Sequence, residues 1–119
     1  MSFHPAVAYK VLTGAEMDSF EQCGSFKGSP VDLADGFIHM STAGQLDETV
    51  NRHFSDQNRL FVLTVDLAAL GDAVKWEPSR GGAMFPHLYG ALPKSAVIAH
   101  GQLARAPDGS IIVPGGEIP

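Results

Sequence analysis

The stretch RLFVLTVDL, residues 59–67, constrains the fold of this chain most, because it is nearly all apolar and rich in strand-forming residues. A short continuous apolar run of this kind is typical of a strand buried on both faces of a sheet. The apolar stretch that contains it continues to Leu70, which is too short to span a bilayer, and Asp66 interrupts it. We therefore expect a central strand at 59–67, with the rest of the chain packed around it.

A capping motif predicts where the first helix begins. Thr13 is followed three residues later by Glu16, so that each side chain can bond to the backbone N–H of the other residue. Gly24 is a suitable residue to end a helix, because glycine adopts the left-handed conformation found there. The motif and the glycine together predict a helix at 14–23.

The same motif recurs at Thr42 and Gln45. Leu46, Val50 and Phe54 then follow at intervals of four residues, which places them on one face of a helix. Acidic residues near the start of this segment and basic residues near its end also suit the helix dipole. A second helix is therefore predicted directly after Thr42.

Several shorter runs rich in Val, Ile, Tyr and Leu predict further strands. They are 6–12, 37–41, 73–77 and 95–103, and the turn residues APDGS before IIV predict a closing hairpin. Segments 24–36 and 76–90 are punctuated by Gly and Pro, which favours loop, with room for one helical turn in the first. Early helices and later strands indicate a single α+β domain over 1–119, with a mixed, largely antiparallel sheet and two helices in its N-terminal half.

Composition limits the function classes. The net charge of −5 and the lack of a basic run argue against a surface that coats nucleic acid. Cys23 is the only cysteine, so no internal disulfide can form. The first ten residues lack the pattern of a signal peptide. We expect a cytoplasmic protein that avoids membranes, is a monomer or weak dimer, and has a small-molecule ligand.

Two of the five histidines lie where a strand meets turn residues, a common place for functional sites. They are His39, in DGFIHMST, and His87, in FPHLYG. Both are candidate catalytic residues, and we expect them to open onto one cleft. The alternative is that each is a core histidine whose ring bonds to a backbone group.

The backbone N–H groups at the start of the helix after Thr42 form a candidate anion site. Strand alternation places Ser41 on the same face as His39, beside those N–H groups. Ser41 and Thr42 are therefore candidate ligand-binding residues. The alternative is an ordinary capped helix without a ligand.

The segment WEPSRGGAMFPHLYG adds further polar and aromatic groups. Arg80 offers a forked cation next to two glycines, whose backbone can form a nest of N–H groups for an anion. Glu77 is a candidate general base or acceptor for a ribose hydroxyl, or else a partner of Arg80. Phe85 and Tyr89 are candidate stacking surfaces for a ligand ring, or else core residues.

Other chemistries find less support. His39, His87 and Glu77 are suitable ligand types for a metal, but their spacing matches no metal motif, so we expect none. Cys23 lacks a nearby basic residue that would activate it. No phosphate-binding loop, dinucleotide fingerprint or nucleophile elbow occurs in the sequence.

Taken together, YKVLT at 9–13, DGFIHMST at 35–42 and WEPSRGGAMFPHLYG resemble the bacterial family known as domain of unknown function 952. The resemblance covers about residues 7–103 and leaves the closing hairpin and tail, 104–119, outside it. That family is grouped with the ADP-ribosyltransferase-like superfamily, which holds NAD in a cleft of a split β-sheet. The resemblance thus implies a split sheet of this type and NAD as a cofactor.

The superfamily resemblance also suggests roles for single residues. Its first strand has a His or Arg that contacts the NAD ribose, and the nearest cationic residue here is Lys10, a departure from that pattern. His39 and Ser41 fall in the segment similar to its second-strand motif, and Glu77 is the candidate for its catalytic glutamate. We expect a small phosphorylated or nucleotide-like ligand, bound either by an ADP-ribosyl-transfer enzyme or by a non-catalytic sensor that uses the same pocket.

Overall fold

The computed structural model describes residues 6–54 and 59–115, apart from the side chain of Arg80. Its main sheet has β4 (Leu60–Asp66) between β1 (Val7–Thr13) and β8 (Val97–Gln102), and both pairings are antiparallel. The successive residues 62–65 of β4 are all fully buried. Because neighbouring side chains of a strand point to opposite faces, this confirms the predicted central strand covered on both sides.

Helix α1 (Gly14–Cys23) has the predicted bounds and the predicted cap. The Glu16 N–H donates to Thr13 Oγ1 at 3.2 Å, and the Thr13 N–H donates to Glu16 Oε1 at 2.9 Å. The helix buries Met17 and Phe20 and ends at Gly24, whose φ of 79° is left-handed. The local rules of helix capping therefore account for both ends of this helix.

Helix α3 (Ala43–His53) also begins where predicted. The Thr42 N–H donates to Gln45 Oε1 at 3.0 Å, and Leu46 and Val50 are buried. Both residues belong to a core cluster that they share with Tyr9 and Val11 of β1. A second, larger cluster contains Met17 and Phe20 of α1, so α1 and α3 each contribute to a core cluster that also contains β1 residues.

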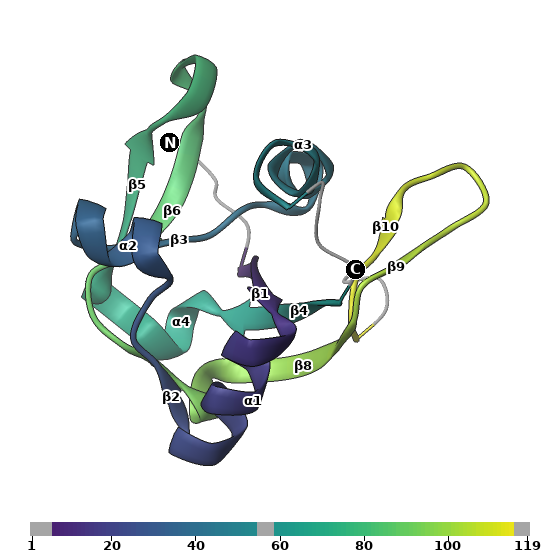
Figure 1. Cartoon of the computed structure of the whole chain (residues 1–119). Coiled ribbons are helices and arrows are strands. Elements are labelled where there is room, and N and C mark those ends of the chain that lie inside the picture. Colours follow the sequence, from purple (N-terminus) through teal and green to yellow (C-terminus); the bar gives the residue numbers. More distant parts are fainter. Residues whose placement is uncertain (1–5, 55–58, 116–119) are drawn as a thin grey trace.

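A second three-stranded sheet corrects the interpretation of residues 76–90 as loop. It has the order β3 (Ile38–His39), β6 (Met84–Leu88), β5 (Val74–Pro78), and β5 and β6 stand together at one side of the molecule (Figure 1). Pro86 lies within β6 and has no N–H, but its carbonyl accepts a hydrogen bond from the Met40 N–H at 3.1 Å. Proline normally indicates the edge of a sheet, which is why the sequence pattern hid this strand.

Segment 24–36, also interpreted as loop, contains a short strand and a short helix. Strand β2 (Ser25–Phe26) pairs with β7 (Leu92–Pro93), and α2 (Pro30–Asp35) follows. Ser29 and Asp32 form a capping box at the start of α2, where Pro30 occupies the first helical position, and Gly36 ends the helix with φ of 88°. The described residues of the N-terminal half, 6–54, therefore form three helices where two were predicted.

The remaining elements are small. They are α4 (Leu67–Leu70), the 3-10 turns η1 (Gly71–Ala73), η2 (Arg80–Gly82) and η3 (Lys94–Ala96), and the hairpin of β9 (Ala104–Arg105) and β10 (Ile111–Ile112). The hairpin was predicted, and it projects on the opposite side of the molecule from β5 and β6 (Figure 1). None of the helices within residues 6–54 and 59–115 is long and apolar enough to cross a membrane.

The chain is thus a compact α+β unit built from several small antiparallel sheets and helices. Every strand pairing found in the described residues is antiparallel, so the parallel component implied by a mixed sheet is not seen there. Two backbone hydrogen bonds between Tyr9 and Ser41, at 2.8 and 2.9 Å, link β1 to the segment that follows β3. They join the main sheet to the second sheet.

Candidate functional site

His39 and His87 are direct partners across the antiparallel pair of β3 and β6. Directly opposite residues place their side chains on the same face of a sheet, and the two ring centroids lie 5.4 Å apart at 69°. The side chain of His39 is 31% exposed, whereas that of His87 is only 4% exposed. The histidines therefore lie together on one face of the sheet, with His39 partly exposed and His87 buried.

His87 is held by a carboxylate from the neighbouring strand. Its Nδ1 lies 2.8 Å from Glu77 Oε1, and the Tyr89 hydroxyl donates to the same oxygen at 2.8 Å. These hydrogen bonds hold the pKa of Glu77 below its usual range and keep the carboxyl ionised. The bond from His87 has the larger effect and the bond from Tyr89 the smaller. The hydrogen bond to Glu77 is also the main cause that raises the pKa of Tyr89.

The Nε2 atom of His87 differs from Nδ1. It is buried, and no hydrogen-bond partner for it is found in the part of the chain that the structure describes. A carboxylate only accepts hydrogen bonds, so the ring nitrogen facing Glu77 carries the proton, and a neutral ring then has a lone pair at Nε2. A polar atom buried in this way is uncommon in folded proteins.

His39 is held by Asp32, which forms the capping box at the start of α2 together with Ser29. Asp32 Oδ1 lies 2.7 Å from His39 Nδ1 and accepts from the His39 N–H at 3.1 Å. Lys10 Nζ lies 2.9 Å from Asp32 Oδ2 and donates to the His39 carbonyl at 2.9 Å. Burial by itself would raise the pKa of Asp32, but the His39 hydrogen bond and the Lys10 charge outweigh it and hold the pKa well below its usual range.

A second carboxylate faces the other side of the same ring. His39 Nε2 lies 2.9 Å from Oδ2 of Asp35, the last residue of α2, which precedes His39 by four residues. The Asp35 side chain is 49% exposed, so this contact reaches the surface. The ring is therefore fixed at both nitrogens, by a buried carboxylate and by an exposed one.

Phe37 lies among these rings. It stacks on His87 with centroids 4.1 Å apart at 23°, and its centroid lies 4.6 Å from His39 and 5.2 Å from Tyr89. Its side chain is only half-buried. We call Phe37, His39, His87, Glu77 and Tyr89 the histidine face.

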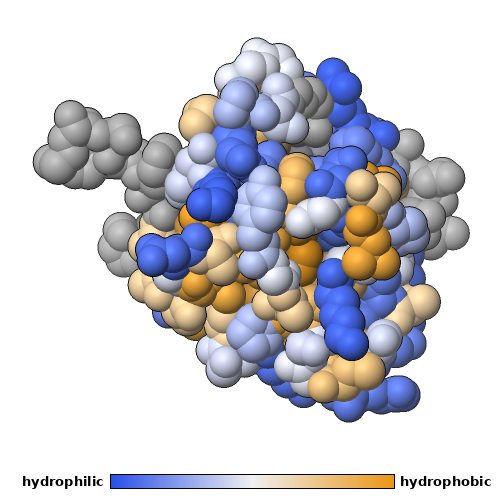
Figure 2. All heavy atoms as spheres, turned by 90° about the vertical axis from the view of Figure 1, so that its left-hand side faces the viewer, coloured by the Kyte–Doolittle hydropathy of each residue, from blue (hydrophilic) through white to orange (hydrophobic). Residues whose placement is uncertain are grey.

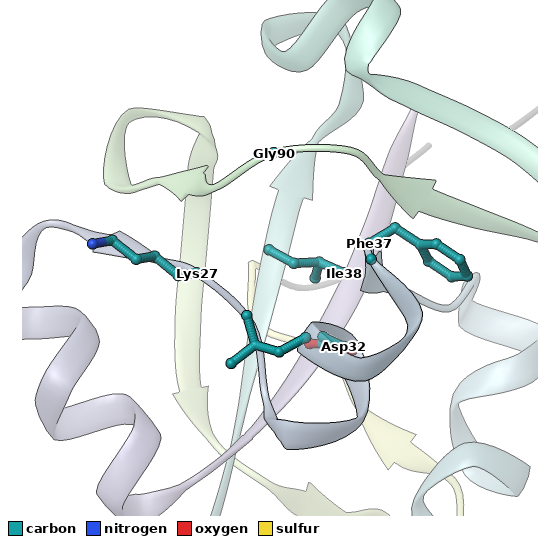
Figure 3. A pocket seen from close by; sticks show the side chains of 7 residues that line it. Lys27, Asp32, Phe37, Ile38 and Gly90 are labelled. Atoms are coloured by element: carbon teal, nitrogen blue, oxygen red, sulfur yellow. The ribbon is translucent and has the colours of Figure 1, made fainter.

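A small hollow lies beside this face. Its volume is about 190 Å³, and Phe37 and Asp32 contribute to its lining. Figure 3 shows the Phe37 ring and the Lys27 side chain pointing in opposite directions. Pockets for small ligands usually enclose about 300 to 1,000 Å³, so this hollow is too small for a nucleotide.

The other predicted ligand-binding residues on β1 and α3 occupy supporting positions. Lys10 is buried, and its ammonium group binds Asp32 and the His39 carbonyl. Ser41 is buried too, with Oγ 2.9 Å from Thr49 Oγ1 on α3. Thr42 caps α3 at a half-buried position. Lys10 thus contacts the backbone of His39, and the Ser41 side chain points toward α3.

The predicted residues of the β5–β6 hairpin lie at different positions along it: Arg80 in the turn η2, Phe85 within β6, and Tyr89 directly after β6. Gly81 and Gly82 both have left-handed φ, 68° and 82°, and the Gly82 N–H is already bonded to the Ser79 carbonyl at 2.8 Å. The side chain of Arg80 lies outside the described part of the structure. Phe85 is buried, whereas Tyr89 is 40% exposed and available for stacking.

The residues that hold the histidines, Asp32, Asp35 and Phe37, were not singled out in the sequence. A signal for Asp32 was present: the segment SPVD has the spacing of a capping box with Pro at the first helical position. For Phe37 and Asp35 the sequence offered no signal beyond their nearness to His39. No group of three or more His, Cys, Asp or Glu side chains suited to a metal ion is found among the described residues.

The outer surface near this site mixes polar and apolar residues. Val31 and Leu33 of α2, Met84 of β6 and Tyr89 are exposed apolar side chains. Figure 2 views the molecule from the side of α2 and β5 and shows hydrophobic groups separated by hydrophilic ones. Scattered apolar residues of this kind are normal for a protein surface.

Comparison with solved structures finds this fold in structures of CC0527 from Caulobacter crescentus, a structural-genomics target. Its crystal structure is 47% identical, with a TM-score of 0.80, over 88% of this chain and 92% of that chain. A crystal structure of its double mutant is 45% identical with a TM-score of 0.79, over 88% and 92% of the two chains. Its solution structure is 46% identical with a TM-score of 0.75, over 90% and 91%.

No curated protein matches this chain. The family described as "Protein of unknown function (DUF952)" matches residues 11–100, which include the end of β1, all of β3, β5 and β6, and every residue of the histidine face. The match covers most of the chain, and it agrees with the similarity to CC0527 across nearly the whole fold. The chain therefore belongs to the DUF952 family.

Proposed function

We propose that this protein binds a small nucleotide-like ligand at the histidine face. The observation that carries the proposal is the cross-strand pair His39 and His87, whose rings are held by carboxylates, His39 at both ring nitrogens and His87 at Nδ1. Fixing the tautomer and orientation of a histidine with a carboxylate is a recurrent device of active and binding sites. Two such histidines side by side, next to exposed Tyr89, are more than a structural core requires.

The charges around the histidines indicate which part of a ligand lies there. Asp32 is paired with Lys10, whereas Glu77 and Asp35 contact the histidine rings and no Lys or Arg side chain that the structure describes. Carboxylates stabilise hydroxyl donors and positive charge, and they repel phosphates. A sugar or a cationic ring would therefore lie at the histidine face, and the phosphates would lie toward Arg80 and the glycine pair at the tip of the β5–β6 hairpin.

ADP-ribosyl transfer from NAD is the reaction that this arrangement would support. The resemblance to the ADP-ribosyltransferase-like superfamily motivates it, and the ionised state of Glu77 supports it. Glu77 would lie beside the positively charged ribose that develops as the nicotinamide bond breaks, and it would stabilise that transition state more than the ground state. His39 and His87 would act as hydrogen-bonding and acid–base groups.

A non-catalytic sensor is the second candidate function, and one observation favours it. Phe37 covers the ring of His87 and the adjacent hollow is small, so the catalytic groups are closed off in this conformation. A protein that only binds has no need for a reactive group that is open to solvent. The same ligand classes apply to both functions.

The test begins with binding. Melting temperatures are measured with NAD, ADP-ribose and ribose 5-phosphate, because a ligand present at 100 times its dissociation constant adds about 2.7 kcal/mol of stability. Arg80→Ala should weaken binding by about 1.5 to 3 kcal/mol if Arg80 holds a phosphate, since it removes a charge-assisted hydrogen bond. Arg52→Ala is the matched control, because Arg52 lies on α3 in an exposed pair with Glu48.

Catalysis is tested by release of nicotinamide from NAD. Turnover by the wild type that is lost in Glu77→Gln, with affinity for NAD retained, would support the transferase. Binding without turnover would support the sensor. A melting temperature that none of these ligands raises would remove the proposal of a nucleotide site.

A further inference from the structure

The unpartnered Nε2 atom of His87 is the most unusual feature of the histidine face. Its ring is anchored at the opposite nitrogen by Glu77, at 2.8 Å, and Glu77 is in turn bonded to the Tyr89 hydroxyl. This chain of contacts orients the ring and leaves a lone pair at Nε2. Leaving a buried acceptor unpaired lowers stability, so the arrangement calls for an explanation other than packing.

Phe37 is the group that covers this histidine. Its ring lies against the face of the imidazole, with centroids 4.1 Å apart. It is half-buried, and it follows Gly36, which has a left-handed φ of 88° at the end of α2. A phenyl ring has no polar atom, so its rotation about the side-chain bonds of Phe37 breaks no hydrogen bond.

We propose that His87 Nε2 is the hydrogen-bond acceptor and general base for a hydroxyl group of the ligand, and that the Phe37 ring is its movable cover. The inference rests on the proposed function, because it assigns a role within the same face. The ligand displaces the phenyl ring and directs a hydroxyl at Nε2 along the plane of the imidazole, where the nitrogen lone pair lies.

The proton transfer balances within the site. The O–H bond of the ligand breaks, an N–H bond forms at Nε2, and the electron pair stays on the ligand oxygen. The ring becomes an imidazolium, whose charge is neutralised by the Glu77 carboxylate at Nδ1. The same carboxylate disfavours an anionic group at this position, so the ligand group is a neutral alcohol, such as a hydroxyl of a sugar, and not a phosphate.

The first experiment measures acylation of His87 by diethyl pyrocarbonate, a reagent that modifies imidazole nitrogens with a lone pair. Mass spectrometry follows His87 and His100 in one sample, since His100 is exposed in β8 and serves as an internal reference. In the wild type His87 should react far more slowly than His100. Phe37→Ala should raise the rate at His87 by at least about tenfold, equivalent to about 1.4 kcal/mol of opening free energy.

Two further variants keep this test decisive. Phe37→Tyr retains an aromatic cover and should leave His87 as slow as in the wild type, and Phe37→Leu covers less of the ring and should give an intermediate rate if Phe37→Ala does not fold. Nitrogen NMR of the ring should show Nε2 without a proton. A protonated Nε2, or an unchanged rate at His87 in a folded Phe37→Ala protein, would overturn the proposal.

The second experiment tests the preference for a hydroxyl group. In Phe37→Ala, phenol brings both a ring and an O–H donor, whereas anisole has the same ring without the donor. Phenol should protect His87 from the reagent at about five- to tenfold lower concentration, the effect of one neutral hydrogen bond. Equal protection by the two compounds would refute the role of Nε2 as acceptor. Neither experiment uses a nucleotide, so failure of nucleotide binding would be seen separately.

Discussion

Asp32→Asn should destabilise this protein more than the loss of any exposed charge. Asp32 is 2% exposed, and its carboxylate binds Lys10 and His39 and accepts the Ser29 N–H at 2.9 Å. Asparagine retains one oxygen but loses the charge, which leaves the Lys10 ammonium buried with the His39 carbonyl as its described partner. Removing one partner of a buried ion pair typically costs about 3 to 5 kcal/mol.

This loss is large compared with the whole stability of a domain, which is about 5 to 15 kcal/mol. For a chain of this length each kcal/mol corresponds to about 4 °C in melting temperature, so a decrease of about 12 to 20 °C is expected. Urea denaturation gives the free energy of unfolding directly, and circular dichroism gives the melting temperature. Both should be measured on the purified variant and the wild type at pH 7.

Two controls separate the effect of burial from that of charge. Asp18→Asn removes an exposed pair with Arg59, whose side chains are more than half exposed, and should cost no more than about 1 kcal/mol. The double variant Lys10→Met with Asp32→Asn should recover part of the loss, because it removes the unpaired buried charge. If Asp32→Asn cost no more than Asp18→Asn, the argument from the buried pair would be refuted.

Three further predictions concern pH, backbone conformation and the Glu77 carboxylate. The pKa of Asp32 is lower in the folded than in the unfolded state, so its stabilisation is present above the unfolded value of about 3.9 and is lost as pH falls toward the folded value; urea titrations below pH 4 should therefore fall less steeply for Asp32→Asn than for the wild type. Gly36→Ala should lower the free energy of unfolding by about 1 to 2 kcal/mol, because φ is 88° there and an added Cβ would meet no neighbouring atom, so that only the backbone is strained. Gly44→Ala in α3 is the control: its Cβ also meets no neighbour, and the variant should be neutral or stabilising. Glu77→Gln should leave the melting temperature nearly unchanged but lower the pKa of the Tyr89 hydroxyl, measured by ultraviolet titration, since the hydrogen bond to an ionised carboxylate raises that pKa. An unchanged titration would contradict the hydrogen bond between Tyr89 and Glu77.

The parts of the fold that follow local rules were predicted from the sequence. The capping boxes located α1 and α3, and the apolar run located β4 at the centre of its sheet. The turn residues near the C-terminus predicted the β9–β10 hairpin. In each case the signal lies within a few residues, so no knowledge of distant contacts was needed.

The parts that depend on distant pairing were missed. Strand β6 contains Pro86 and forms because β5 and β3 flank it, which no local pattern indicates. Helix α2 has only six residues, too few to show a helical period. The sequence indicated His39 and His87 separately, but their direct opposition follows from the register of β3 and β6, and no local pattern predicts that Phe37 stacks on His87.

The links between β1 and the segment around Ser41 have a consequence for how the molecule loosens. Tyr9 exchanges two backbone hydrogen bonds with Ser41, and the next residue, Lys10, reaches the His39 carbonyl. All three links cross from the main sheet to the sheet that carries the histidines. A region tied to the core in this way opens in the same cooperative step as the core, as amide hydrogen exchange would report. The backbone amides of β3 should therefore exchange as slowly as those of the central strand β4.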